Sequence, residues 1–243
     1  MTSIDARSDA SDSSDARVVD AGEVDAGSAE SDTALVCLSP GHPSEEGDKC
    51  YEAIINRKVA YNLRALLLEH GFDVLITTSD LTDRHLFSSG FDNEDESNWD
   101  RLAVQSPEEK AEICNDADAD YVISIHHNYA YTRDTNHTMV LYGVDDKYAP
   151  RHEAAKRWAH MTARRLRQVM KTRSSRAFGD RNRLGYTLEI ISKSNAPAIL
   201  TEASFYSNPK ERRRLNRDTY IEREAQAIFK AFRDFYRDVN QQE

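Results

Sequence analysis

The chain has 243 residues, of which 39% are hydrophobic, and its formal net charge is -10. This length supplies a sizeable core for one large domain or two small ones. No apolar run approaches the roughly 20 residues of a membrane-spanning helix, so no membrane span is predicted. The N-terminus shows neither the basic nor the apolar region of a secretory signal peptide. That pattern predicts a cytoplasmic protein, or one exported or released by another route.

Residues 1–32 form an acidic tail of distinct composition. They hold seven Asp and two Glu against two Arg, and they contain no aromatic residue. Such a Ser-, Ala- and Asp-rich segment cannot bury enough apolar surface to fold alone. We therefore expect a disordered tail at 1–32 and a single catalytic domain at 33–243.

The folded part begins with a β-α-β pattern. Residues 33–39 (TALVCLS) are a continuous apolar run, which is typical of a strand covered on both faces. After a polar loop, residues 51–71 place Ile, Val and Leu at helical spacing and end at Gly71. Residues 72–78 (FDVLITT) are predicted to be the next strand, and the unit implies parallel pairing with a right-handed crossover.

Helices and strands continue to alternate along the rest of the chain. Residues 79–106 are polar and too long for a simple connection, so we expect an inserted surface loop there. The pattern predicts strands at 120–128, 138–144 and 196–205 and helices at 107–116, 150–171, 208–215 and 219–238. This alternation favours an α/β fold, a three-layer α/β/α sandwich around a mixed, mostly parallel twisted sheet.

The three cysteines, Cys37, Cys50 and Cys114, are odd in number and lack a CxxC spacing. They do not form a disulfide framework of the kind found in small secreted domains. We expect Cys37 and Cys114 to be buried or free thiols.

Charge is unevenly distributed within the folded part. Residues 147–183 hold twelve bases and two acids, whereas residues 80–120 hold thirteen acids and three bases. Either two solvated faces pair with each other, or the basic face binds an anionic polymer. The basic stretch has few aromatic residues, so no nucleic-acid partner is predicted.

Polar side chains that can carry chemistry follow several predicted strands. His42 follows the first strand, His126 and His127 end the strand at 120–128, and Glu202 comes directly after an apolar run. Glu52 stands at the start of the first helix. Ligands in open α/β sheets bind at the carboxyl ends of the strands. Adjacent histidines point to opposite faces, so an ordinary strand offers only one of them to a given site.

Two histidines and a glutamate from separate elements make the ligand set of a catalytic zinc, which keeps a fourth position for water. The remaining carboxylate, Glu202, can then act as a general base. Each residue alone has an ordinary explanation, because a histidine after a strand usually makes a structural hydrogen bond. A carboxylate at a helix N-terminus likewise stabilises the helix dipole. The coincidence of four such residues at one sheet edge favours the zinc site.

Four motifs in order carry a resemblance to a known family. They are LSPGH, EAIINRKVAYNLRALLLEHGFDVLITTSD, ADYVISIHHN and PAILTEASFYSN. Together they resemble the zinc-dependent N-acetylmuramoyl-L-alanine amidases of the type 3 family, which are cell-wall hydrolases. The resemblance extends from Leu35 to Tyr236. The arginine usual in the family after the second strand is absent here.

The resemblance implies a specific site. It assigns one Zn²⁺ to His42, Glu52 and His126, and it makes Glu202 the catalytic acid/base. His127 then becomes a packing residue or one that supports the site from behind. Asn128, which shares the strand parity of His126, is expected to contact substrate.

The loop before Glu52 leaves other metal ligands open. Cys50, Glu45 and Glu46 lie in or near it. We favour Glu52 over Cys50 because Glu52 keeps the helical register with Asn56.

The reaction implied by the resemblance is zinc-dependent hydrolysis of the amide bond between the lactyl group of N-acetylmuramic acid and L-alanine. The partner would be peptidoglycan or a muropeptide, and the site of action the cell wall. Two alternatives remain: another zinc amidohydrolase or carboxypeptidase-like peptidase with the same ligands, and a non-catalytic wall-binding module. The oligomeric state stays open.

Overall fold

A computed structural model describes four stretches of the chain: 33–42, 48–77, 106–144 and 149–241. The acidic tail lies outside these residues, and so does the expected inserted loop apart from Ser106. Both therefore stay predictions.

Six strands form one sheet in the order β2-β1-β3-β6-β4-β5. Neighbouring strands are parallel except for β4 and β6, which are antiparallel. The strands are β1 Leu35–Pro40, β2 Asp73–Ile76, β3 Tyr121–Asn128, β4 Thr138–Tyr142, β5 Ser175–Gly179 and β6 Ala198–Phe205. The predicted mixed, mostly parallel sheet is confirmed. The carboxyl ends of β1, β3 and β6 consequently meet at one edge.

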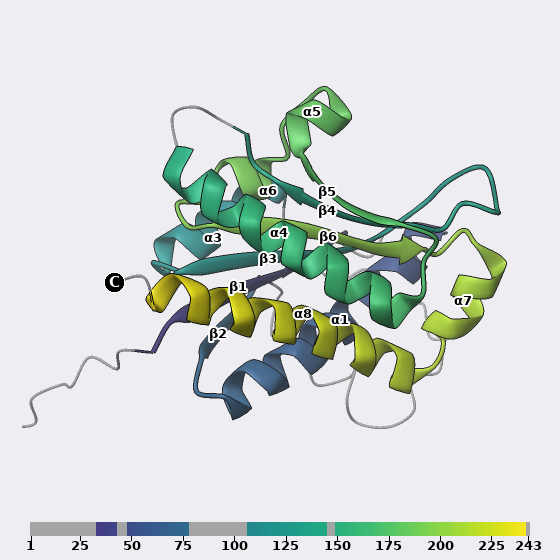
Figure 1. Cartoon of the computed structure of the whole chain (residues 1–243), viewed down its shortest axis with the longest axis horizontal. Coiled ribbons are helices and arrows are strands. Elements are labelled where there is room, and N and C mark those ends of the chain that lie inside the picture. The colour runs from purple at the N-terminus through teal and green to yellow at the C-terminus, as the bar shows by residue number, and fades with distance from the viewer. Residues whose placement is uncertain (1–32, 43–47, 78–105, 145–148, 242–243) are drawn as a thin grey trace, which may run out of the picture. The chain divides into compact units, whose positions relative to one another are not determined.

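Helices cover both faces of the sheet, which makes the three predicted layers. Figure 1 shows α4 and α8 on the near side of the sheet and α3 and α6 behind it. The helices are α1 Asp48–Glu69, α3 Pro107–Asp116, α4 Ala149–Met170, α5 Asp180–Leu184, α6 Glu189–Ser192, α7 Pro209–Leu215 and α8 Asp218–Asn240. None of the described helices combines the length and apolarity needed to cross a membrane.

Alternate side chains of the central strands enter two different cores. Ile123 and Ile125 of β3 belong to the larger core, which α1, α4 and α8 cover. Val122 belongs to the smaller core on the α3 and α6 side. Trp158 of α4 stacks on Phe235 of α8 with ring centroids 5.3 Å apart, which joins the two long helices. Burial on both faces explains the continuous apolar runs in the sequence.

Three elements were not predicted. The strand β5 (SRAFG) lies at the edge of the sheet and is mostly half-exposed, so its sequence lacks the apolar run of a central strand. The helices α5 and α6 have five and four residues, which is too short to show a helical period.

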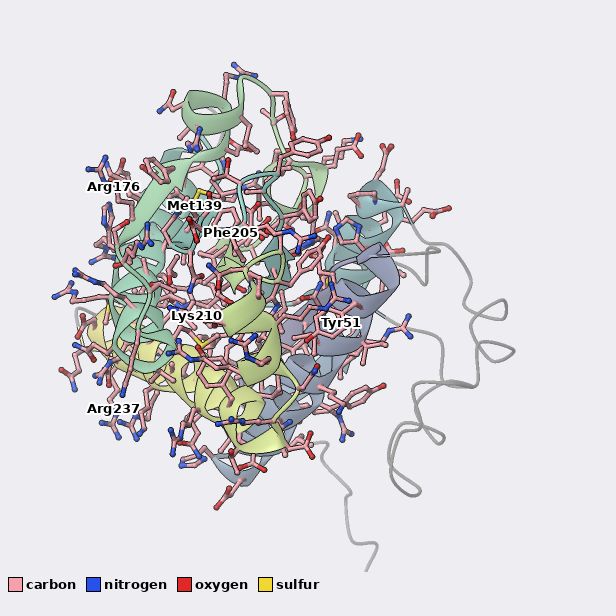
Figure 2. All side chains as sticks on the ribbon, turned by 90° about the vertical axis from the view of Figure 1, so that its right-hand side faces the viewer. Tyr51, Met139, Arg176, Phe205, Lys210 and Arg237 are labelled. Carbon is pink, nitrogen blue, oxygen red and sulfur yellow. A yellow bond between two sulfur atoms is a disulfide. The ribbon has the colours of Figure 1, made fainter. Side chains whose placement is uncertain are left out.

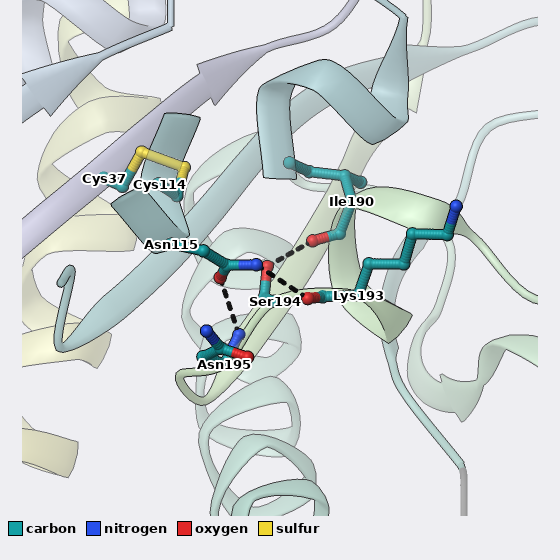
Figure 3. Close-up of a disulfide and its surroundings, with 7 residues drawn as sticks. All are labelled: Cys37, Cys114, Asn115, Ile190, Lys193, Ser194 and Asn195. Atoms are coloured by element: carbon teal, nitrogen blue, oxygen red, sulfur yellow. Dashed lines mark hydrogen bonds between the residues drawn. A yellow bond between two sulfur atoms is a disulfide. The ribbon is translucent and has the colours of Figure 1, made fainter. Parts of the chain in front are cut away.

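The prediction of two thiols is wrong for Cys37 and Cys114, which form a disulfide (Figure 3). The two cysteines are 77 positions apart in the sequence, yet their Cα atoms are 5.7 Å apart. Cys37 lies on the β1 face that α3 covers, and Cys114 is in α3. Neither the separation nor the odd count reveals a pair that only the topology brings together.

The helix α3 is fixed at both ends. Ser106 caps its N-terminus in a reciprocal capping box with Glu109. Near its C-terminus, the Asn115 side chain donates to the Lys193 carbonyl at 2.9 Å and accepts from the Asn195 backbone at 2.7 Å (Figure 3). With the disulfide, these contacts hold α3 against the sheet and the end of α6.

The basic segment is partly paired with acids on its own side of the sheet. Arg165 of α4 pairs with Asp234 of α8, and Lys156 pairs with Glu153 within α4. Most of the acidic stretch 80–120 lies outside the described residues. The pairing of the two charged stretches therefore stays a prediction.

Candidate metal centre

His42, Glu52 and His126 meet at the edge of the sheet where β1 and β3 end. Each offers one ligand atom, and these atoms all lie within 4.8 Å of one another. The Nε2 atom of His42 is 3.4 Å from Glu52 Oε2, and the Nδ1 atom of His126 is 3.3 Å from Glu52 Oε1. The histidine rings meet edge-on with centroids 5.0 Å apart. Three residues from separate parts of the fold thus present two imidazoles and a carboxylate to one point.

The backbone at Gly41 makes room for this arrangement. A Cβ atom on Gly41 would lie 2.0 Å from Cε1 of the His126 ring, which no side chain tolerates. The Gly41 amide donates to the Ile125 carbonyl at 2.8 Å and so continues the pairing of β1 with β3. His42 then leaves the strand with a φ of 57°, an uncommon value outside glycine, which turns the chain at the site.

Glu52 is buried and oriented by hydrogen bonds. Its Oε1 atom accepts from the Asn56 side chain and from the His127 backbone amide, both at 3.2 Å. Burial raises the pKa of Glu52, but the hydrogen bond and charge of His126 and the charge of His42 outweigh it and leave the pKa below its ordinary value. The group is therefore a carboxylate near neutral pH.

His127 faces the opposite side of β3 and is buried in the larger core. Its Nδ1 atom lies 2.9 Å from Asn56 Oδ1, and its Nε2 atom lies 3.1 Å from Glu224 Oε2. Burial lowers the pKa of His127, but the charge and hydrogen bond of Glu224 prevail and raise it. His127 thus stands behind Glu52, on the other side of the strand from His126.

Glu202 lies beside the cluster on the next strand. It is the register partner of His126 in the β3–β6 pair. Its Oε2 atom is buried and has no hydrogen-bond partner among the described residues. Burial, with the negative charge of Glu52, raises the pKa of Glu202 well above its ordinary value. A buried carboxyl oxygen without a hydrogen-bond partner is costly unless it serves a ligand or a reaction.

Asn128 ends β3 and makes local contacts. Its Oδ1 atom accepts from the Tyr129 amide at 2.8 Å, and its carbonyl accepts from the Tyr206 amide at 3.0 Å. Figure 2 shows this end of the domain, with Tyr51 at the start of α1 and Phe205 at the end of β6 labelled. The contact of Asn128 with substrate stays a prediction.

A cavity of about 580 Å³ opens next to the cluster, on the side of the sheet that carries α3 and α6. His42 and His126 form part of its wall, so a molecule in the cavity reaches both histidines. The other lining residues are Ser39, Gly41, Ser106, Pro107, Lys110, Ser124, Tyr186, Thr187, Leu188, Glu189, Ile190 and Leu200.

The sequence did not reveal part of this wall. In the sequence, Lys110 is one of few bases in an acidic stretch, and the segment 186–190 lies between predicted elements. Neither carries a motif, and only the packing of α3 and α6 brings them to the site. The alternative ligands Cys50, Glu45 and Glu46 have no described side chain, so their part in the site is untested.

The chain matches the family model described as N-acetylmuramoyl-L-alanine amidase over residues 24–234. It is also similar to the germination-specific N-acetylmuramoyl-L-alanine amidase of Bacillus subtilis (strain 168). The two are 25% identical over 206 residues, which cover 83% of this chain and 79% of the relative.

Solved structures share the fold. An N-acetylmuramoyl-L-alanine amidase from Clostridium difficile 630 is 20% identical with a TM-score of 0.66, covering 85% of this chain and 98% of the other. The catalytic domain of the amidase CwlV from Bacillus (Paenibacillus) polymyxa is 20% identical with a TM-score of 0.64, and the match covers 85% of this chain and 99% of the other. The CwlD amidase from Clostridioides difficile was solved in complex with the GerS lipoprotein. It is 22% identical with a TM-score of 0.59, and the match covers 84% of this chain and 98% of the other.

Proposed function

The chain belongs to the N-acetylmuramoyl-L-alanine amidase family, and from this premise we propose that it is a zinc-dependent peptidoglycan hydrolase. The bond cleaved is the amide between the lactyl group of N-acetylmuramic acid and L-alanine. One observation carries the proposal: His42, Glu52 and His126 offer ligand atoms within 4.8 Å of one another at the wall of a cavity.

The donor set fits zinc. Two imidazole nitrogens and one carboxylate oxygen are the ligands of many catalytic zinc sites, which leave a further position open. Glu52 is held as a carboxylate by Asn56 and the His127 amide, so it is ready to bind a cation. Bound zinc would supply Lewis acidity. It would polarise a substrate carbonyl and lower the pKa of water, so that a nucleophilic hydroxide is available near neutral pH.

Glu202 handles the protons in this proposal. Burial and the charge of Glu52 raise the pKa of Glu202, which favours a carboxyl group that accepts and returns a proton. It takes a proton from the attacking water and returns it to the nitrogen of the leaving L-alanine. Its place as the register partner of His126 supports this role.

The cavity and the end of β3 position the substrate. The cavity takes the leaving stem peptide, because its volume of about 580 Å³ is typical of a ligand site and both histidines line it. Asn128 lies on the same strand beyond His126, and its Oδ1 atom is already bonded to Tyr129. Its amide nitrogen is then the group that donates to the substrate.

One observation favours a second candidate, a carboxypeptidase-like peptidase. Lys110 is a buried cation in the cavity, and such a group could hold the terminal carboxylate of a peptide. A peptidase would hydrolyse peptides that carry no sugar. The amidase requires the lactyl amide, so a sugar-free peptide of the same sequence separates the two candidates.

The experiment pairs metal content with activity. The wild-type chain, His126→Ala and the control His160→Ala are purified, and their zinc content and release of peptides from muropeptides are measured. His160 is exposed on α4, so its loss should change neither quantity. Wild type should hold one zinc per chain, and His126→Ala should lose zinc and activity together. Full activity of a zinc-free wild-type protein would contradict the proposal.

A further inference from the structure

Lys110 is a buried cation that pairs with no carboxylate in the described part of the chain. Its exposed fraction is 9%, and its Nζ atom donates to the Pro40 carbonyl at 2.7 Å. An ammonium group has three N–H donors, so this contact uses one of them. Burial, and then the positive charge of Arg57, lower the pKa of Lys110 to about 8. Below that pH, the buried charge costs free energy that a bound anion would offset.

Two serines add hydrogen-bonding capacity to the same cavity. Ser39 of β1 and Ser124 of β3 are register partners on neighbouring strands, and both line the cavity. Each hydroxyl group can donate one hydrogen bond and accept others. They form a polar floor close to the strand ends that carry the histidines.

The charge of the cavity suits an anion. Among the described residues that line it, Lys110 is the only lysine or arginine. The one acid there, Glu189, is 3.5 Å from Lys193, which also pairs with Glu108. An ammonium group and hydroxyl groups facing one cavity are complementary to a carboxylate.

We propose that Lys110, Ser39 and Ser124 form a subsite for a free carboxylate of the leaving stem peptide. The carboxylate belongs to the residue that follows the alanine of the scissile amide. This inference rests on the proposed function, since it assigns the peptide to the cavity.

The anchoring of Lys110 limits how far this carboxylate can lie from the proposed zinc ligands. Lys110 binds the carbonyl of Pro40, two residues before the proposed zinc ligand His42. Each residue spans at most about 3.3–3.6 Å, so the Pro40 carbonyl lies no more than about two residue lengths from His42. A carboxylate on the second stem residue is within that reach. An amide at the same place would set its own N–H donors against the lysine, which is unfavourable.

A purely structural role of Lys110 makes a different prediction. If the lysine only ties α3 to the end of β1, its loss should weaken hydrolysis of every substrate by the same factor. If it binds a carboxylate, its loss should weaken only substrates that carry one. The ratio between two matched substrates separates these roles.

The test uses two synthetic muropeptides whose second residue is a glutamate linked through its side chain. Its α-carboxylate is free in one and amidated in the other. Wild type should show a kcat/KM about 10- to 100-fold higher for the free carboxylate, the usual effect of a hydrogen bond to a charged group. Lys110→Met should lose this preference, and Lys110→Arg should keep part of it. The control Lys156→Met, on the exposed side of α4, should behave as wild type.

Binding of the two product peptides to the zinc-loaded chain, measured by calorimetry, gives a readout that does not need turnover. Tighter binding of the free carboxylate by wild type, and equal binding by Lys110→Met, would support the subsite even if neither muropeptide were cleaved. Failure of cleavage alone would then count against the proposed function. Equal affinity and equal kcat/KM of wild type for both forms would overturn the subsite. An equal loss on both forms in Lys110→Met would overturn it too.

Discussion

At the scale of single residues, the adjacent histidines of β3 divide two tasks between the faces of one strand. His126 points to the cluster with Glu52, whereas His127 is buried between Asn56 and Glu224. The two are linked, because the His127 amide and the Asn56 side chain both hold the Glu52 carboxylate. The core behind the strand therefore sets the geometry of the proposed metal site.

Replacing His127 should affect stability far more than metal content. His127→Ala leaves Glu224 buried without its partner, and breaking a buried pair costs about 3–5 kcal/mol. The free energy of unfolding should fall by that order, while the folded protein still binds zinc. Denaturant unfolding and metal analysis of one preparation check both points. Loss of zinc from a fully folded His127→Ala, equal to the loss in His126→Ala, would count against the assignment of the ligands.

Replacing Glu202 separates proton transfer from metal binding. Glu202→Gln keeps the shape of the side chain and removes its titratable group, so fold and zinc content should survive. Turnover should fall by roughly 10²- to 10⁴-fold, the usual contribution of a general acid or base. Zinc and turnover are measured on the same sample. Loss of zinc would make Glu202 a ligand, and unchanged turnover would exclude both roles.

The carboxylate preference proposed for Lys110 should depend on pH. Because burial and Arg57 lower the pKa of Lys110 to about 8, the ammonium is present below that pH and is lost above it. The substrate carboxylate is ionised throughout this range. The ratio of kcat/KM for the free and amidated muropeptides should therefore decline as the pH rises through 8, since kcat/KM reports the free enzyme. A ratio that stays constant from pH 6 to pH 10, probed at steps of about one unit, would argue against this role.

The sequence marks some residues of the candidate site clearly and others not at all. His42, Glu52 and Glu202 follow apolar runs or begin a helix, so strand ends mark them. Parity alone cannot choose between His126 and His127, because it does not say which face carries the site. Lys110 is invisible in the sequence, since only the packing of α3 turns an ordinary helical lysine into a cavity wall.

At the scale of elements, α3 links the core to the cavity. Its C-terminal half is tied to β1 by the Cys37–Cys114 disulfide. Its N-cap Ser106 and, from its first turn, Pro107 and Lys110 line the cavity. Long periodic elements such as α1 and α8 were predictable because they cover many turns. The disulfide and the short elements β5, α5 and α6 were not, because their signals are either tertiary or too brief.

Removing the disulfide should lower the free energy of unfolding, while the chain still folds. A crosslink over a loop of 77 positions is expected to contribute about 2–5 kcal/mol, chiefly by restricting the unfolded chain. The double variant Cys37→Ser, Cys114→Ser should unfold at a lower denaturant concentration than wild type and still bind zinc. Wild type treated with a reductant should follow the variant. Identical unfolding of oxidised wild type and the double variant would contradict this expectation.

At the scale of the whole molecule, a folded unit at 33–243 follows an acidic segment at 1–32. The folded unit contains both cores, the cluster and the cavity. The family match begins within the acidic segment, at residue 24. Whether those first matched residues serve catalysis is therefore a question that deletion can answer.

Deleting residues 1–32 should leave catalysis unchanged, because their composition cannot contribute to a core. The truncated chain should hydrolyse soluble muropeptides with the kcat/KM of the full chain. A variant lacking only residues 1–23 is the control, since it keeps every residue of the family match. A folded truncation that has lost its activity would refute the prediction, and a loss confined to the longer deletion would place a needed segment at 24–32.

The proposed activity can be tested by identifying the bond that the zinc-loaded chain cleaves in purified peptidoglycan. Released fragments are analysed by mass spectrometry, with Glu202→Gln as the inactive control. An amidase should release stem peptides with a free N-terminal L-alanine and leave glycan strands whose muramic acid keeps its lactyl group. Glycan fragments with new reducing ends, or peptides cut between later stem residues while the lactyl amide stays intact, would contradict it.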